Sequence, residues 1–344
     1  MTRMQTLMAA TAFSLLTAAG TASAAPAAPA LEPTTQHFLD ALTAKGGPKI
    51  YQLTPDQARN VLAGAQSGDV AKQPANIVDR TIPGGPTGSV RLRIVRPQDS
   101  ENAVLPAVMY FHGGGWILGD KNTHDRLVRE IANGAGAAVV FVDYDRSPEA
   151  KFPVPIEQAY AATKYVAEHG DEFKIDPSRL AVAGDSVGGN MTAAVTLLAK
   201  ERHGPKIVFQ VLFYPVTDAN FDDGSYKTFA NGPWLTREAM KWFWNAYLPD
   251  KAKRRDPLAS PLQASIEQLR GLPPALLITD ENDVLRDEGE AYGRKLAAAG
   301  NVVTSVRYNG TIHDFAMLNA IAGTPATRGA IAQANAALKQ ALAK

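Results

Sequence analysis

Short apolar runs alternate with longer helical patterns along most of this chain, from about residue 76 onwards. Residues 89–96 alternate apolar and polar side chains, which is typical of a half-buried edge strand. Later apolar runs are mostly β-branched and bounded by Gly, Pro or Asp, as buried parallel strands are: residues 107–111, 137–144, 180–183, 207–214, 275–279 and 302–308. Between them the pattern predicts helices over residues 124–133, 155–168, 191–200, 286–299 and 325–343.

This alternation predicts an α/β fold in which a mainly parallel sheet carries helices on both faces. Two segments break the alternation. Residues 31–75 are helical and amphipathic without a strand, and residues 217–262 form an insertion rich in aromatic side chains: Trp234, Trp242, Phe243, Trp244 and Tyr247. We expect both segments to form a helical cap at the carboxyl ends of the strands, where such sheets bind ligands. The alternative is that the aromatic side chains only pack the insertion onto the sheet. That holds for most of them, and one or two are expected to face a substrate.

The first 24 residues have the pattern of an export signal. Arg3 provides a positive start, residues 7–19 are apolar, and Ala22-Ser23-Ala24 is a small-residue cleavage site. The apolar stretch is short for a stable membrane span, although an uncleaved N-terminal anchor is the alternative. We therefore expect an exported protein, periplasmic or secreted. The predicted parts are a signal peptide (1–24), a leader and N-terminal cap helices (25–75) and a main domain (76–344).

Charge and cysteine content exclude several classes of protein. The chain has 35 Lys and Arg against 34 Asp and Glu, and removal of the signal would take away one basic residue. A neutral chain has no electrostatic attraction to nucleic acid or anionic lipid. The absence of cysteine excludes disulfides, a thiol nucleophile and cysteine-ligated zinc.

A G-x-S-x-G motif stands between a predicted strand and a predicted helix, at residues 184–188. In that setting it indicates a nucleophile elbow, a sharp turn that presents the Oγ of Ser186 above the sheet. Upstream, the sequence His-Gly-Gly-Gly-Trp at residues 112–116 directly follows another predicted strand. A glycine run at that place supplies backbone N–H groups that can form an oxyanion hole together with the N–H of Val187.

A serine nucleophile needs a base and a carboxylate that orients the base. Among the histidines, His313 alone follows the last predicted strand, in a glycine-containing loop at residues 309–312, whereas His203 leaves no room for an acid-bearing strand after Ser186. Five carboxylates follow the strand at residues 275–279, and they compete for the role of the acid: Asp280, Glu281, Asp283, Asp287 and Glu288. Position on the loop favours Asp283 and leaves Asp280 open.

With these motifs the chain resembles the hormone-sensitive-lipase-like microbial esterases (bacterial family IV), a branch of the α/β-hydrolase fold. The resemblance runs from about residue 76 to the C-terminus. It rests on HGGGWILGD (112–120), THD (123–125), GDSVGGN (184–190), SPL (260–262), and LPPA (272–275) leading to DVLRDEG (283–289). It implies the catalytic residues Ser186, Asp283 and His313, and the oxyanion donors Gly114, Gly115 and Val187. It also implies a helical cap matching residues 31–75 and 217–262.

Three positions depart from the family pattern. Val187 replaces the usual alanine and is expected to narrow the acyl side. The sequence YDRSPE at residues 144–149 replaces Y-R-L-A-P-E, which leaves the contacts beneath the site open. Asp314 replaces the glycine that usually follows the base. Its carboxylate either raises the pKa of His313 or points to solvent.

These features predict a serine carboxylesterase that hydrolyses short- to medium-chain acyl esters through an acyl-enzyme intermediate, without a cofactor or metal. Its partner is a small-molecule ester, which we expect to contact Trp116, Trp234 and Trp242. The alternatives are a lipase acting on long-chain lipid, an exopeptidase, and a non-catalytic ligand-binding relative. The choice between a monomer and a homodimer stays open.

Overall fold

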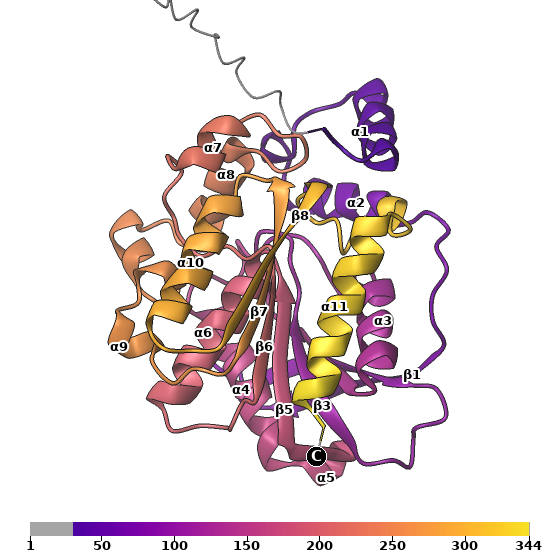
Figure 1. Cartoon of the computed structure of the whole chain (residues 1–344), viewed down its shortest axis with the longest axis vertical. Coiled ribbons are helices and arrows are strands. Elements are labelled where there is room, and N and C mark those ends of the chain that lie inside the picture. The colour runs from indigo at the N-terminus through magenta and orange to yellow at the C-terminus, as the bar shows by residue number, and fades with distance from the viewer. Residues whose placement is uncertain (1–29, 344) are drawn as a thin grey trace, which may run out of the picture.

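The computed structural model describes residues 30–343, and at its centre lies one eight-stranded sheet (Figure 1). The strand order is β1-β2-β4-β3-β5-β6-β7-β8. The strands are Ala75–Pro83 (β1), Ser89–Pro97 (β2), Leu105–Phe111 (β3), Ala138–Asp143 (β4), Ile175–Asp185 (β5), Phe209–Phe213 (β6), Ala275–Asn282 (β7) and Val303–Ile312 (β8). Strand β2 pairs antiparallel with β1 and β4, and the other neighbours pair parallel. The predicted α/β fold with a mainly parallel sheet is confirmed.

The edge strand β1 is not apparent from the hydrophobic pattern. Of its nine residues only Ile82 is buried, so the strand carries little of the apolar signal from which strands are predicted. It is held instead by its antiparallel pairing with β2 over the whole length of both strands.

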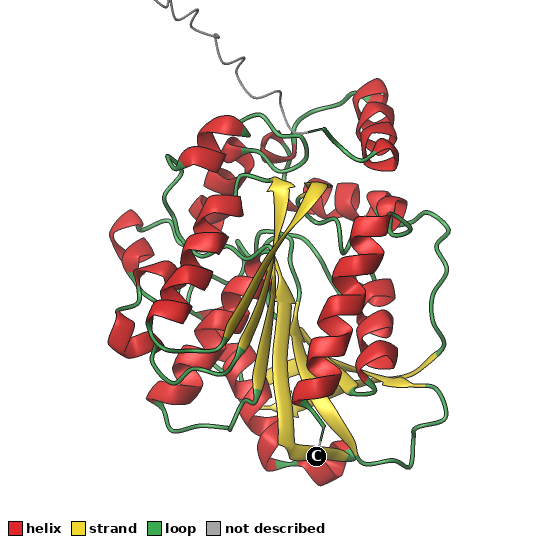
Figure 2. Ribbon diagram, in the orientation of Figure 1, coloured by secondary structure: helices red, strands yellow, loops and turns green. Residues whose placement is uncertain are grey.

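Helices cover both faces of the sheet, as predicted (Figure 2). The helices α3 (Asp125–Ala135) and α11 (Pro325–Ala341) pack together on one face, and α4 (Val154–Glu168), α6 (Val187–Glu201) and α10 (Arg286–Ala298) lie on the other. Strand β7 shows how one strand serves both faces. Leu276 and Ile278 belong to the main apolar cluster, while Leu277 belongs to a second cluster with α10. This division follows from the two-residue period of a strand.

The two segments that break the alternation lie beyond the carboxyl ends of the parallel strands, at the top of Figure 1. The first contains α1 (Pro33–Lys45), the 3-10 turn η1 (Ile50–Gln52) and α2 (Pro55–Ala65). The second contains α7 (Gly224–Thr228), α8 (Arg237–Tyr247) and the short turns η2 (Lys251–Arg255) and η3 (Pro261–Gln263). The remaining short helices are α5 (Gly170–Phe173), α9 (Ile266–Leu269) and η4 (Asn319–Ile321).

Gln66 fastens the N-terminal segment to the far end of the chain. Its buried Nε2 donates to the carbonyl oxygens of Thr123 (2.8 Å) and Met317 (2.9 Å). Its Oε1 accepts from the backbone N–H of Asn319 at 2.9 Å. All three bonds are long-range, so α2 is positioned by loops that also border the sheet's carboxyl edge.

Strands β7 and β8 both run further than the sequence pattern predicts. Residues 309–312 were expected to form a loop, but they complete β8, with Gly310 at a φ of 71°. Strand β7 continues to Asn282, which pairs with Ile312 across a shift in register. As a result Asp283 and His313 each follow directly after the end of a strand, which places them side by side.

Among residues 30–343, no helix combines the length and the apolar character needed to cross a membrane. The predicted signal peptide (residues 1–24) and nearly all of the leader that follows it lie outside the described residues.

Candidate active site

Ser186 lies in the turn between β5 and α6, where its φ of 55° is in the left-handed region. That conformation is rare for a residue other than glycine. The neighbouring glycines allow the turn to be this sharp. A Cβ on Gly188 would lie 1.9 Å from the carbonyl oxygen of Phe111, and one on Gly184 would lie 2.3 Å from that of Gly188. The sequence therefore builds the strained turn that its G-x-S-x-G motif predicts.

Ser186 begins a chain of hydrogen bonds that ends at Asp283. Its Oγ lies 2.9 Å from His313 Nε2, and His313 Nδ1 lies 2.8 Å from Asp283 Oδ2. The backbone N–H of Leu285 donates to the other carboxylate oxygen of Asp283 at 3.1 Å. The side chains of Ser186, His313 and Asp283 are all buried. This arrangement can remove the proton of the serine and orient and stabilise the resulting imidazolium.

The two carboxylates that the sequence left in competition occupy different positions. Asp280 lies in β7 with Oδ2 3.9 Å from His313 Nδ1, beyond hydrogen-bond distance. Asp283 occupies the hydrogen-bonding position. The other candidates have different partners: Glu281 accepts from the N–H of Gly310, Asp287 pairs with Arg286, and Glu288 accepts from the N–H groups of Thr217 and Asp218.

Asp314 does not point to solvent. Its side chain is buried, with Oδ1 3.4 Å from His313 Nε2, and its Oδ2 accepts a hydrogen bond from Trp234 Nε1 at 2.9 Å. The backbone of Asp314 is itself left-handed, with a φ of 68°. Burial raises the pKa of Asp314, against the opposing effect of the His313 charge.

Carboxylates therefore approach both ring nitrogens of His313. Burial by itself lowers the pKa of His313, but the charges of Asp283 and Asp314 and the hydrogen bond to Asp283 outweigh it and raise the pKa to about 9. The imidazolium form is consequently well stabilised in this site. Of the two alternatives left open by the sequence, the structure has the one in which Asp314 lies beside the ring, and its charge acts to raise the pKa of His313.

A buried polar cluster joins the serine turn to the glycine run. Asp185, next to Ser186, accepts from the N–H of Gly113 (3.0 Å) and from the hydroxyl of Tyr110 (2.7 Å), and it lies 3.2 Å from His124 Nε2. Burial alone would raise the pKa of Asp185, but the charge and hydrogen bond of His124 lower it. The ionised Asp185 thus fixes the glycine run against the turn that carries the serine.

His112 stabilises the same loop from beneath. Its Nδ1 lies 2.8 Å from the carbonyl oxygen of Gly113, and its own carbonyl oxygen accepts from the hydroxyl of Tyr144, whose ring stacks on the imidazole. Burial lowers the pKa of His112 to about 3, so this ring stays neutral. The residues beneath the site that the sequence could not place therefore include Tyr144 as a support for the glycine run.

Gly114, Gly115 and Val187 lie at the places predicted for oxyanion donors. Within residues 30–343 their backbone N–H groups make no hydrogen bond, so they remain able to bind an incoming oxygen. Gly115 has a φ of 63°, and a Cβ there would lie 2.1 Å from Cδ1 of Phe243 in α8. Glycine is therefore needed at this position because the second segment packs directly against the loop. The side chain of Val187 is fully buried and lies outside the cavity lining, so it does not narrow the acyl side as expected.

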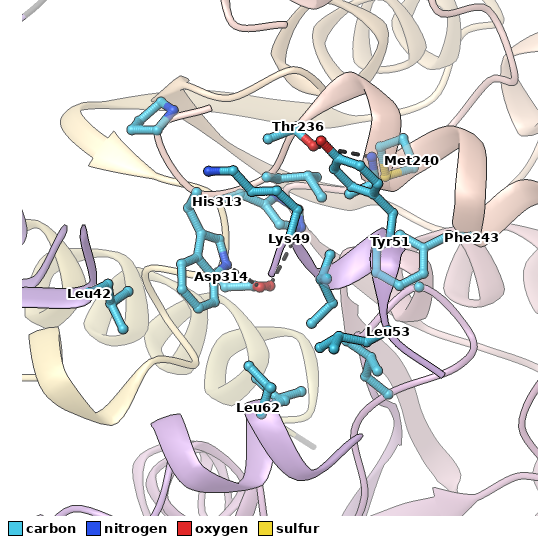
Figure 3. A pocket seen from close by; sticks show the side chains of 18 of the residues that line it. Leu42, Lys49, Tyr51, Leu53, Leu62, Thr236, Met240, Phe243, His313 and Asp314 are labelled. Atoms are coloured by element: carbon cyan, nitrogen blue, oxygen red, sulfur yellow. Dashed lines mark hydrogen bonds and ion pairs between the residues drawn. The ribbon is translucent and has the colours of Figure 1, made fainter. Parts of the chain in front are cut away.

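A cavity of about 380 Å³ opens over Ser186 and His313 (Figure 3). The sheet core contributes only a few lining residues, among them Gly114 and Gly115. Most of the wall comes from the two segments beyond the strands, with Leu42, Lys49, Tyr51, Leu53 and Leu62 from the first and Thr236, Met240 and Phe243 from the second. The sequence pattern identified both segments and named Phe243 among the aromatic side chains of the second. It did not single out the other lining residues, because apolar and polar side chains alternate in an amphipathic segment without showing which of them face a cavity.

The three tryptophans predicted to contact a substrate have separate positions. Trp234 lines the cavity. Trp116 is fully buried behind it, stacked on Tyr247 with ring centroids 3.9 Å apart, and Trp242 lies outside the lining against Phe243. Neither Trp116 nor Trp242 therefore lines this cavity, because Trp116 packs against Trp244 and Tyr247 of α8 and Trp242 lies against Phe243 of its own helix.

Asp280, Asp283 and His313 also form a group whose oxygen and nitrogen atoms lie within 4.8 Å of one another, as metal ligands can. The hydrogen bond of 2.8 Å between His313 and Asp283 occupies the space that an ion bridging them would need. These residues fit a proton-transfer chain better than a metal site.

The sequence and structure were compared with known proteins. A family model described as alpha/beta hydrolase fold matches residues 108–317. Carboxylesterase NlhH of Mycobacterium tuberculosis is 41% identical over 239 residues, which are 69% of this chain and 74% of that protein. Esterase LipI of the same species is 39% identical, covering 79% of this chain and 83% of LipI. The crystal structure of a thermostable esterase from Pseudomonas putida ECU1011 superposes with a TM-score of 0.90 at 53% identity, covering 92% of this chain and 99% of that one.

Proposed function

As the chain belongs to the alpha/beta-hydrolase family and is a carboxylic ester hydrolase, we propose that Ser186, His313 and Asp283 are its catalytic triad. The observation that carries the proposal is the unbroken hydrogen-bonded chain from Ser186 Oγ through both ring nitrogens of His313 to Asp283. Ser186 and His313 line the cavity, and the left-handed φ of Ser186 belongs to the sharp turn between β5 and α6.

The reaction follows from these positions. His313 Nε2 takes the proton as Ser186 Oγ attacks the ester carbonyl, and Asp283 holds the ring and stabilises its charge. We assign the oxyanion to the N–H groups of Gly114, Gly115 and Val187, where one donor contributes about 3–4 kcal/mol to the transition state. His313 then protonates the leaving alcohol. In the second half it deprotonates the water that hydrolyses the acyl-enzyme.

We further propose that residues 31–75 and 217–262 act as a cap that restricts the acyl group. The volume of about 380 Å³ is near the lower end for ligand pockets, and Leu62, Met240 and Phe243 give the lining apolar surface. Short- and medium-chain esters are the substrates that such a cavity favours. A cap that excludes water also strengthens the hydrogen bonds to the oxyanion.

The nucleophile is tested by Ser186→Ala. The variant should lose ester hydrolysis and covalent labelling by an organophosphonate, because no other group takes the place of Ser186 Oγ. Ser178→Ala, at an exposed serine, is the matched control and should behave as the unchanged protein. Covalent labelling of the Ser186→Ala protein would contradict the assignment of the nucleophile.

The substrate class is tested with p-nitrophenyl esters of increasing acyl length. We expect kcat/KM to peak at roughly two to eight carbons, because longer chains exceed the cavity. No activation should appear when the ester forms an emulsion. A preference for emulsified long-chain triglyceride over soluble short esters would instead identify a lipase.

We also propose that the protein is exported through cleavage of residues 1–24, on the basis of the signal pattern in the sequence. Mass spectrometry of the protein recovered from the periplasm or medium should then give an N-terminus at Ala25. A full-length chain retained in the membrane fraction would favour an uncleaved anchor.

A further inference from the structure

Asp280 is a buried carboxyl group that the proposed mechanism does not use. Its side chain is fully inaccessible to solvent, and it lies in β7 beside Tyr308 of β8. Within residues 30–343, neither of its oxygens accepts a hydrogen bond. A buried carboxylate without donors is among the most costly groups that a protein can contain.

The surroundings of Asp280 contain further carboxylates, together with His313, whose Nδ1 lies 3.9 Å from Asp280 Oδ2. Asp283 and Asp314 are the charged neighbours that act on it most strongly, and His313 is already paired with Asp283. Burial, followed by the charges of Asp283 and Asp314, raises the pKa of Asp280 well above its usual range. These effects favour the protonated form of Asp280, and a protonated carboxyl is a hydrogen-bond donor.

We propose that Asp280 is a neutral carboxylic acid that donates a hydrogen bond to Asp283 and so acts as a positioning residue for the triad. The inference rests on the proposed triad. Asp280, Asp283 and His313 bring their oxygen and nitrogen atoms within 4.8 Å of one another, and Asp280 Oδ2 lies 3.9 Å from His313 Nδ1. His313 Nδ1 already faces Asp283, so the carboxylate of Asp283 is the neighbouring acceptor for a proton on Asp280.

This bond would complete the set of donors around Asp283. Oδ2 already faces His313 Nδ1, and Oδ1 accepts from the Leu285 N–H. A third donor fixes the plane of the carboxylate. It also holds the carboxylate in the orientation that accepts the proton of His313 Nδ1, so that Nε2 faces Ser186.

Two substitutions of similar size separate this role from simple packing. Asp280→Asn keeps the shape and supplies an N–H donor, so we expect its kcat to stay within about threefold of the unchanged enzyme. Asp280→Leu removes the donor, and its kcat should fall about 10- to 100-fold at nearly constant KM, as for a lost bond to a charged group. Rates are expressed per site that an organophosphonate labels, which removes the contribution of misfolded protein. Equal loss in both variants, or full activity per labelled site in Asp280→Leu, would overturn the proposal.

The pH profile decides the charge of Asp280 independently. If Asp280 is neutral, Asp280→Asn removes no charge, and the limb of kcat/KM that reports His313 should stay in place. If Asp280 is ionised, the same change removes a negative charge 3.9 Å from Nδ1 and moves that limb to lower pH, which would refute the proposal.

Infrared spectroscopy gives a second measurement of the same charge. The carbonyl band of a protonated carboxyl should be present in the unchanged protein and absent from Asp280→Asn. Continued activity of Ser186→Ala would refute the triad instead, so the two failures are distinguishable.

Discussion

His313 differs from the base of a simple triad in having carboxylates near both ring nitrogens. Asp283 binds Nδ1, whereas Asp314 lies 3.4 Å from Nε2, the nitrogen that must accept the serine proton. The arrangement stabilises the imidazolium of the transition state and, equally, the imidazolium of the resting enzyme. Since the resting enzyme needs neutral His313, activity should rise with pH through the raised pKa of about 9.

Asp314→Asn should move this pH dependence. The amide keeps the shape and an acceptor for Trp234 Nε1 but removes the negative charge, so the pKa of His313 falls. We expect the lower limb of the kcat/KM profile to shift toward acid by about one pH unit. The exposed Asp171, in α5 at the opposite end of the sheet, provides the matched control Asp171→Asn, whose profile should not move. A profile of Asp314→Asn that coincides with the unchanged enzyme would show that this carboxylate does not act on the base.

At the scale of residues, chain order restricts which side chains can meet, and the geometry agrees with that order. Ser186 is in the predicted turn, and His313 and Asp283 are within hydrogen-bond distance of each other, as the order of strands implies. The orientation of Asp314 could not be predicted, because it depends on a left-handed backbone and on Trp234, which is 80 residues away. The buried position of Trp116 behind the cavity could not be predicted for a similar reason. A tryptophan beside a glycine run can face either the cavity or the packing behind it.

The element that matters most for the proposed oxyanion hole is α8, which presses on the glycine run. Phe243 would lie 2.1 Å from a Cβ on Gly115, so the loop and the helix fit together only while residue 115 is glycine. Apolar periodicity predicts a helix in this region, but it cannot reveal which face of that helix meets the loop. Strand β1 and the end of β8 were missed for related reasons, since an exposed edge and a bulge carry weak hydrophobic patterns.

Gly115→Ala should therefore abolish most activity. The new methyl group must displace Phe243 or the loop, which moves the backbone N–H groups assigned to the oxyanion and lowers kcat by about 100-fold or more. Gly136→Ala is a closely matched control. Gly136 has a φ of 64°, almost the same as the 63° of Gly115, but nothing lies within 4 Å of its Cβ position. Its substitution should cost about 1 kcal/mol of stability and leave kcat unchanged. Equal kcat values for the two variants would contradict the proposed dependence on Phe243.

On the scale of the whole molecule, the cavity is assembled from distant parts of the chain. Its wall runs from Leu39 to Asp314, and Gln66 ties the first segment to residues 317 and 319. The sequence predicted which segments would meet over the serine, because insertions at the carboxyl edge of a parallel sheet have few other places to go. The hydrogen bonds of Gln66 could not be predicted, because they depend on a single side-chain amide in a stretch of polar residues.

Gln66→Leu should weaken this closure. The substitution leaves the buried carbonyl oxygens of Thr123 and Met317 and the N–H of Asn319 without their partner, which costs about 2–3 kcal/mol. Urea unfolding should show the loss as a lower midpoint. Gln36→Ala, which removes only an exposed bond to Asp40, should change stability by less than about 0.5 kcal/mol. A midpoint unchanged by Gln66→Leu would mean that the segment is held by its apolar contacts alone.

The bond between Gln66 and Met317 spans 251 residues and also bears on how the protein folds. A contact between residues so far apart in sequence requires a long loop to close. The conformational entropy lost in that closure is not offset until the contact has formed, so such contacts form late in folding. A refolding chain should therefore form its helices and central strands well before residues 31–75 and 217–262 close over Ser186. Recovery of esterase activity would follow the slowest phase of refolding, later than the return of the helical signal in circular dichroism.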